Sequence, residues 1–185
     1  MRTIPGMVIL NPADAVEARL AVKAAIDYNG PVYLRFGRMA VPVIYGDDYK
    51  FEIGRGVKLA DGKDVSLIAT GIEVEQALLA RELLASEGIS ASVVNIPTIK
   101  PLDEELVIAE ANACGAVVTC EEHTVIGGLG AAVAECLSEK RPTPVLRVGV
   151  NDVFGRSGPA KELVSYFGLD AAAIAAKAKA AVALK

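Results

Sequence analysis

The sequence predicts an α/β fold: a mostly parallel sheet with helices on both faces, preceded by a partial β–α–β unit. Hydrophobic residues make up 52% of the chain but aromatic residues only 5%, so the apolar content is mainly Ala, Val, Ile and Leu, as in helices packed on a buried parallel sheet. Short β-branched runs alternate with helical segments along most of the chain. With 185 residues, the chain has room for one domain plus a fragment but not for two full domains.

The first 47 residues are predicted to form one β–α–β unit. A β-branched run stops at Asn11-Pro12, a helical segment over 13–29 carries Asp14 in its first turn, and a second run follows over 30–37. The predicted helix is apolar on most sides, so it should be covered by more protein than this segment supplies. Two strands and one helix cannot close a core. We therefore interpret residues 1–47 as the last part of a larger domain and expect Met1 to be an internal position of a longer chain.

Residues 39–58 break the alternating pattern with several prolines and glycines. We interpret residues 48–58 as a connector, with a short extended piece over 51–53. Four repeats of strand then helix follow, so residues 59–185 are predicted to form a complete domain. The predicted strands cover 64–71, 89–97, 116–123 and 145–150, the helices that follow them cover 73–87, 103–112, 127–139 and 160–166, and an Ala-rich helix over 170–185 closes the chain.

The composition excludes several classes of partner. A net charge of −4 and a pI of about 5.1 argue against nucleic acid, which requires a basic surface. The sequence lacks a run of about 18 apolar residues, so no membrane partner is expected, and its start does not resemble a secretory signal, which predicts a cytoplasmic protein. The three cysteines form no CxxC pair and are predicted to be buried apolar residues. No metal site is predicted, because one histidine and scattered carboxylates lack ligand spacing.

The segment 119–130 carries the highest density of chemical groups. Glu121, Glu122 and the only histidine, His123, lie at the end of a predicted buried strand, and Gly127 and Gly128 follow at a helix start. This is where α/β sheets place ligands, but neighbouring strand residues point to opposite faces, so Glu121 and Glu122 should not share one cleft. The alternative to catalysis is a docking or capping element. In that interpretation Glu122 and His123 bond to a neighbouring domain, and the glycines allow close backbone approach.

Two further loops carry arginines. Arg38 follows Phe36-Gly37 just past the second predicted strand, where a guanidinium suits bidentate binding of phosphate or carboxylate, or a structural ion pair. The loop 151–159 contains Asp152, Arg156 and Ser157. These three side chains could line a pocket, or the loop could be a plain strand-to-helix turn with Pro159 at the helix start.

Several ordered motifs resemble the C-terminal half of transketolase-family proteins, and above all the C-terminal subunit of split bacterial transketolases. The resemblance covers essentially the whole chain. The motifs lie at 4–14, 30–38, 68–71, 98–103, 121–130 and 152–155.

The resemblance implies an enzyme that uses thiamine diphosphate with a divalent metal to move two-carbon ketol units between sugar phosphates. It implies that residues 1–47 are the last β–α–β of the pyrimidine-binding domain and residues 59–185 the transketolase C-terminal domain. Arg38 matches the family's arginine that contacts the sugar phosphate, whereas Arg156 stands where the family usually has an acidic residue. The family's cofactor-activating glutamate, aromatic wall and substrate-contacting histidines lie upstream. No catalytic or cofactor-binding residue is therefore assigned here, and no cofactor is expected on this chain alone.

The predicted function is thus the C-terminal portion of a transketolase-type enzyme, active only with the missing domains or an N-terminal subunit. The alternative is a non-catalytic assembly or regulatory module that uses the same domain as a dimer scaffold. In either case we expect a homo-oligomer, with Glu122, His123, Gly127 and Gly128 as interface candidates. The sugar donor and acceptor, and the choice between transketolase and deoxyxylulose-phosphate synthase chemistry, stay open.

Overall fold

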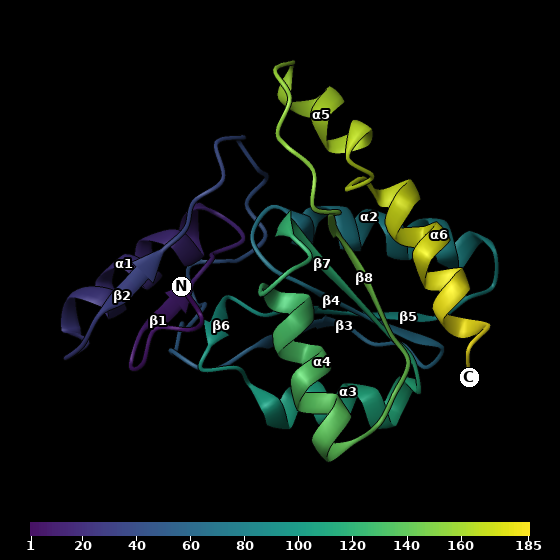
Figure 1. Cartoon of the computed structure of the whole chain (residues 1–185), viewed down its shortest axis with the longest axis horizontal. Coiled ribbons are helices and arrows are strands. Elements are labelled where there is room, and N and C mark those ends of the chain that lie inside the picture. Colours follow the sequence, from purple (N-terminus) through teal and green to yellow (C-terminus); the bar gives the residue numbers. More distant parts are fainter.

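A five-stranded sheet forms the centre of the protein, and a smaller sheet lies beside it (Figure 1). The computed structural model describes residues 1–185. The large sheet has the order β3-β5-β4-β7-β8, and its strands are β3 (Val57–Ala60), β4 (Val65–Ala69), β5 (Ala91–Asn95), β7 (Val117–Thr124) and β8 (Val145–Val150). Strands β5, β4, β7 and β8 are parallel, and only β3 at the edge is antiparallel to its neighbour. The predicted mostly parallel sheet is confirmed.

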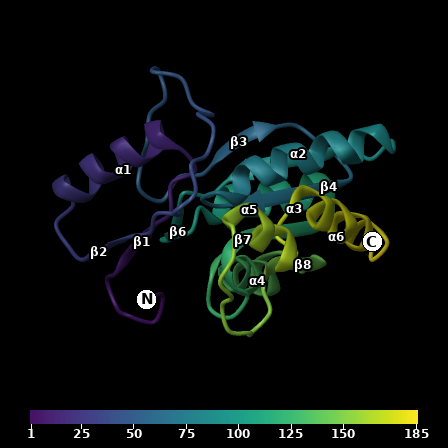
Figure 2. The same ribbon diagram turned by 90° about the horizontal axis from the view of Figure 1, so that it is seen from above.

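Helices cover both faces of this sheet (Figures 1 and 2). On one face α2 (Glu73–Ser86) and α6 (Ala171–Val182) pack on alternate strand residues such as Leu67. On the other face α3 (Glu104–Cys114) and α4 (Leu129–Lys140) pack on the intervening residues, such as Ile68. Because both faces are buried, the central strands are apolar throughout rather than alternating.

The short helix α5 (Ala160–Tyr166) differs from the other helices of this region. It has no buried residue and projects from the body of the molecule at the top of Figure 1. None of the helices combines the length and the apolar content needed to cross a membrane. The three cysteines are buried and unpaired.

The N-terminal segment forms the predicted partial β–α–β unit. Strands β1 (Val8–Leu10) and β2 (Val32–Leu34) are parallel, and α1 (Ala15–Asp27) connects them. A third strand, β6 (Thr98–Lys100), pairs antiparallel with β1, although it lies within the segment predicted as a separate domain. The sequence analysis missed β6 because three residues between Pro97 and Pro101 carry no periodic signal. Only the long-range pairing with β1 makes them a strand.

The connector also differs from expectation. The extended piece predicted over 51–53 is wrong, since the strand of this region is β3, which begins at Val57. Phe51 and Ile53 instead pack on the small apolar core of Val8, Leu10 and Ala21. An apolar pair such as Phe51 and Ile53 is compatible with either a strand or a loop. Here the segment is a loop, because both side chains are buried against β1. Gly56, near the other end of the connector, donates its backbone N–H to the Asp103 carboxylate at 2.9 Å, so the connector packs along both units.

A buried polar cluster joins α1, the connector and the large sheet. The carboxylate of Glu17 accepts hydrogen bonds from the backbone N–H of Ala13 at 2.7 Å, the hydroxyl of Tyr49 at 2.6 Å and the amide of Asn95 at 2.9 Å. The Tyr49 ring stacks on Tyr45, with 3.8 Å between the ring centroids. Because Asn95 lies in β5, this cluster holds the two sheets at a defined position through hydrogen bonds.

Candidate functional site

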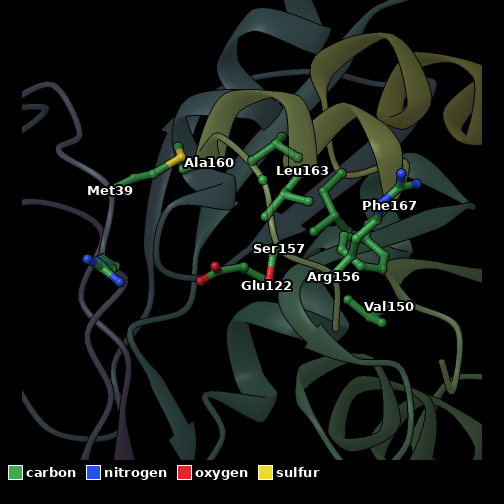
Figure 3. A pocket seen from close by; sticks show the side chains of 12 residues that line it. Met39, Glu122, Val150, Arg156, Ser157, Ala160, Leu163 and Phe167 are labelled. Carbon is green, nitrogen blue, oxygen red and sulfur yellow. The ribbon is translucent and has the colours of Figure 1, made fainter. Parts of the chain in front are cut away.

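A cavity of about 780 Å³ lies between the segment after β2 and the loop that leads from β8 into α5. Arg38 and Met39 line it from the N-terminal unit, Glu122 from β7, and Arg156 and Ser157 from the loop. Apolar side chains complete the wall: Val150, Leu163, Val164, Phe167 and Leu169. In Figure 3, Met39 lies on one side of Glu122, and Leu163 and Phe167 lie on the other. The cavity is therefore built by both units, with cationic groups beside an apolar wall.

The two arginines of this cavity are exposed. The Arg156 guanidinium lies over the ring of Tyr166, 4.8 Å from its centroid, which is a cation–π contact that leaves the N–H donors at the edge of the guanidinium free. A planar cation with free donors matches the oxygens of a phosphate or carboxylate. The cavity can therefore bind an oxyanion attached to a carbon chain.

Glu122 connects the two units at the cavity. Arg35, which follows β2, donates from Nη2 to the backbone carbonyl of Glu122 at 2.5 Å and to its carboxylate at 3.2 Å. The Glu122 side chain is 35% exposed, so the ion pair itself contributes on the order of 1 kcal/mol or less. The carboxylate that Glu122 presents to the cavity is therefore already bound by Arg35.

Glu121 faces away from this cavity, as the alternation along a strand predicts. Its side chain is 1% exposed, and its oxygens accept hydrogen bonds from the backbone N–H groups of Leu129 at 2.7 Å and Gly130 at 2.8 Å. Burial raises the pKa of Glu121, whereas these two hydrogen bonds act in the opposite direction. A Cβ atom on Gly128 would collide with the Glu121 carboxylate. Glu121 therefore has a structural role: it caps α4. The sequence had suggested Glu122 and His123 for a capping or docking role, but the cap is Glu121.

The remaining interface candidates lie around a second hollow of about 360 Å³, which Glu121, His123, Gly127 and Gly128 line together. His123 contacts the carbonyl of its neighbour Thr124 through Nδ1 at 2.8 Å, and its side chain is 45% exposed. Gly127 has φ of +75°, a left-handed conformation that glycine adopts without strain. The structure thus separates Glu122 from the other three residues, whose interface role stays a prediction.

Glu73 is a residue of this region that the sequence analysis missed. It begins α2 after the short turn 70–72 that follows β4, is fully buried, and neither carboxylate oxygen has a hydrogen-bond partner. Burial, together with the nearby charges of Glu122 and Asp170, raises its pKa to about 8. In sequence Glu73 is an ordinary acidic residue in a first helical turn. The only available signal was its position at the carboxyl end of a strand.

The fold and the cavity define the class of protein: an α/β C-terminal domain joined to the end of a second domain, with an oxyanion-binding cavity between them. Residues 54–174 match the family described as transketolase, C-terminal domain, and residues 1–43 match the transketolase pyrimidine binding domain. The chain therefore belongs to the transketolase family.

Relatives of known sequence support this membership. The chain is 47% identical over 178 residues to a putative transketolase C-terminal section of Methanocaldococcus jannaschii, covering 95% of this chain and 55% of that protein. It is 47% identical over 171 residues to the 6-deoxy-6-sulfo-D-fructose transketolase subunit SqwH of a Clostridium species, covering 92% of this chain and 53% of that protein. The chain thus spans about half the length of the curated relatives it matches.

Solved structures give the same result. A split-gene transketolase, solved as an inactive beta4 tetramer, superposes with a TM-score of 0.95 at 48% identity, covering 100% of this chain and 60% of that one. A transketolase from Pichia stipitis superposes with a TM-score of 0.74 at 24% identity, covering 99% of this chain and 26% of that one, and shows the shared fold.

Membership of this family implies thiamine diphosphate as the family's cofactor. No group of three or more His, Cys, Asp or Glu residues in this chain is placed to hold a metal ion. The buried carboxylates of Glu17 and Glu121 are occupied by hydrogen bonds within the chain, whereas that of Glu73 has no partner.

Proposed function

We propose that this chain is the C-terminal portion of a thiamine-diphosphate-dependent transketolase-type enzyme that transfers two-carbon ketol units between sugar phosphates. In this proposal it acts only together with an N-terminal subunit or with the missing upstream domains, which hold the cofactor and its divalent metal. One observation carries the proposal: the two transketolase domains match in order along the chain, while the chain spans about half of its curated relatives.

The part of the reaction that we assign to this chain is binding of the substrate's anionic end. Arg38 would hold the phosphate through its planar set of N–H donors, and the apolar wall of the cavity would exclude water from the sugar's carbon chain. The division into residues 1–47, 48–58 and 59–185 belongs to this proposal, with the qualification that β6 pairs with the N-terminal unit. The three buried, unpaired cysteines agree with a reducing cytoplasm.

We further propose that the chain forms homo-oligomers, a dimer being the smallest. The homologous split-gene transketolase was solved as a tetramer of its beta chain. In this protein α1 fully buries only Glu17 and Ala21 and exposes the apolar side chains of Val22 and Ile26, which are available to a partner. A non-catalytic assembly module would also self-associate. Ketol-transfer activity therefore distinguishes the enzyme part from the assembly module.

Reconstitution tests the proposed function. The chain is assayed for ketol transfer between sugar phosphates, in the presence of thiamine diphosphate and magnesium, alone and together with both the N-terminal subunit and the upstream part that its C-terminal-section relatives carry. We expect activity only in the mixture. Calorimetry that shows micromolar thiamine diphosphate binding to the chain alone would contradict the proposal, as would an assembled mixture without ketol transfer, which supports the assembly module instead.

A further inference from the structure

A short turn leads from β4 into α2, and there the N-terminal unit contacts the domain built on the large sheet. The backbone N–H of Gly71 and the hydroxyl of Thr70 both donate to the backbone carbonyl of Asn11, each at 3.2 Å. A Cβ atom on Gly71 would lie 2.7 Å from the amide nitrogen of the Asn11 side chain, and one on Gly37 would lie 2.7 Å from the Ile72 side chain. The two units therefore touch closely at this turn. We call its contacts with the N-terminal unit the seam.

Glu73 lies directly after the seam, as the first residue of α2. It is fully buried, and neither carboxylate oxygen has a hydrogen-bond partner. Every other buried carboxylate of the chain accepts hydrogen bonds, namely those of Asp14, Glu17, Asp103, Glu110 and Glu121. A buried carboxyl group with neither donor nor cation is stable only in its neutral, protonated form.

The groups around Glu73 also disfavour its ionisation. The charges of Glu122 on β7 and Asp170 at the start of α6 add to the effect of burial, and together they raise the pKa of Glu73 to about 8. Burial also raises the pKa of the Cys120 thiol on β7, so this neighbour is neutral. The guanidinium of Arg35 is bound to Glu122. An ionised Glu73 would thus gain no compensating charge in the folded structure.

Water can reach a buried carboxylate only if a segment that covers it moves. The segment joined to Glu73 is the turn of the seam. Its last residue, Ile72, makes no side-chain hydrogen bond with the helix, and the backbone N–H of Glu73 donates to the carbonyl of Thr70 at a long 3.3 Å. Movement of this turn would break the hydrogen bond between Gly71 and Asn11. Hydration of Glu73 and opening of the seam are therefore coupled.

We propose that Glu73 makes the seam a pH-sensitive contact between the two units. With Glu73 protonated, the turn stays packed on Asn11 and Gly37. Ionisation of Glu73 favours an open form, in which the turn leaves these residues and the carboxylate meets water. The segment that carries Gly37 also carries Arg38, so the open form holds one wall of the cavity less firmly. This inference does not depend on the proposed function.

Hydrogen exchange of the full chain, followed by mass spectrometry between pH 5 and 9, tests the proposal. Each exchange rate is divided by its intrinsic rate at that pH to give a protection factor. In the open form Glu73 ionises near its ordinary pKa of 4.5, and in the closed form near 8. Protection over 68–74 should therefore fall by roughly tenfold per pH unit between pH 5 and 8 and level off above. Protection of β5 should stay higher at every pH. Equal protection of the two segments would mean that the whole chain unfolds, which contradicts a local opening.

Three variants assign the pH dependence to Glu73. E73Q keeps the shape of the side chain but cannot ionise, so protection over 68–74 should not change with pH. The matched control E75Q, a less buried glutamate in the same turn of α2, should follow the wild type. E122Q keeps Glu73 but removes a neighbouring negative charge, so the pH at which protection levels off should decrease. A wild-type slope in E73Q would overturn the proposal, and so would an unchanged levelling pH in E122Q.

Discussion

At the scale of single residues, Glu73 has the least favourable environment for a charge. Its carboxyl group is fully buried and has no hydrogen-bond partner, and a carboxylate there would be close to the negative charges of Glu122 and Asp170. Burial therefore raises its pKa to about 8, so that the group is mostly protonated at neutral pH. Glu73 should therefore contribute to the pH dependence of stability.

The sign of this dependence follows from proton linkage. In the unfolded chain Glu73 ionises near its ordinary pKa of 4.5, whereas in the folded protein it ionises near 8. Its protonation stabilises the fold fully below pH 4.5, and this contribution is lost as the pH rises from about 5 to 8. The isosteric variant E73Q does not titrate. The difference in free energy of unfolding between E73Q and wild type should therefore increase in favour of E73Q by on the order of a few kcal/mol between pH 5 and 8.

Urea unfolding at pH 5, 6, 7 and 8 measures this difference. The matched control is E75Q, which changes a less buried glutamate in the same first turn of α2, and its curve should stay parallel to that of wild type. If E73Q also stays parallel, Glu73 is ionised in the folded protein and the assignment of a raised pKa is wrong.

At the scale of elements, the position of the segment 44–49, which leads into the connector, depends on Asp14 and Glu17 at the N-terminal end of α1. Asp14 accepts hydrogen bonds from the backbone N–H groups of Ile44 at 2.7 Å and Tyr45 at 2.9 Å, and also caps α1 through the N–H of Glu17 at 2.8 Å. Glu17 binds the hydroxyl of Tyr49. The segment that carries Arg38 thus runs from β2 to a fixed anchor on α1, which holds the arginine at the cavity.

Removing one hydroxyl tests this anchor. Y49F deletes the donor to the Glu17 carboxylate but keeps the ring that stacks on Tyr45. The Glu17 carboxylate then loses one of its buried hydrogen bonds, so we expect a loss of about 1–3 kcal/mol in the free energy of unfolding. The control Y33F removes a hydroxyl from a tyrosine that is 37% exposed and should change stability by less than about 0.5 kcal/mol. Equal losses for the two variants in urea unfolding would contradict the anchor.

At the scale of the whole molecule, the N-terminal unit leaves apolar surface uncovered. On α1, Val22 is 39% and Ile26 is 78% exposed, and Tyr33 and Phe36 are exposed nearby in sequence. Figure 2 shows α1 lying on the outer side of the small sheet, away from the body of the protein. Large exposed apolar surface favours association.

We therefore expect the chain to self-associate at micromolar concentration through α1. A charge on this surface should oppose burial, so I26K should shift the mass measured by light scattering toward the monomer. The control L79K places the same charge on α2, where Leu79 is 49% exposed, and should leave the mass unchanged. A monomeric wild-type chain would contradict the expectation, as would equal effects of the two lysines.

The sequence by itself determined the fold class, the order of the main elements and the opposite orientation of Glu121 and Glu122, because these follow from local periodicity and from alternation along a strand. The motifs also identified the family. Only the tertiary structure decided that β6 joins the N-terminal sheet, that Glu121 caps α4, that Glu73 is buried without a partner, and that Arg38 and Arg156 line one cavity. Each of these depends on contacts between residues distant in the chain, which no local pattern encodes. Burial, pairing and the position of a charge are properties of the folded surroundings.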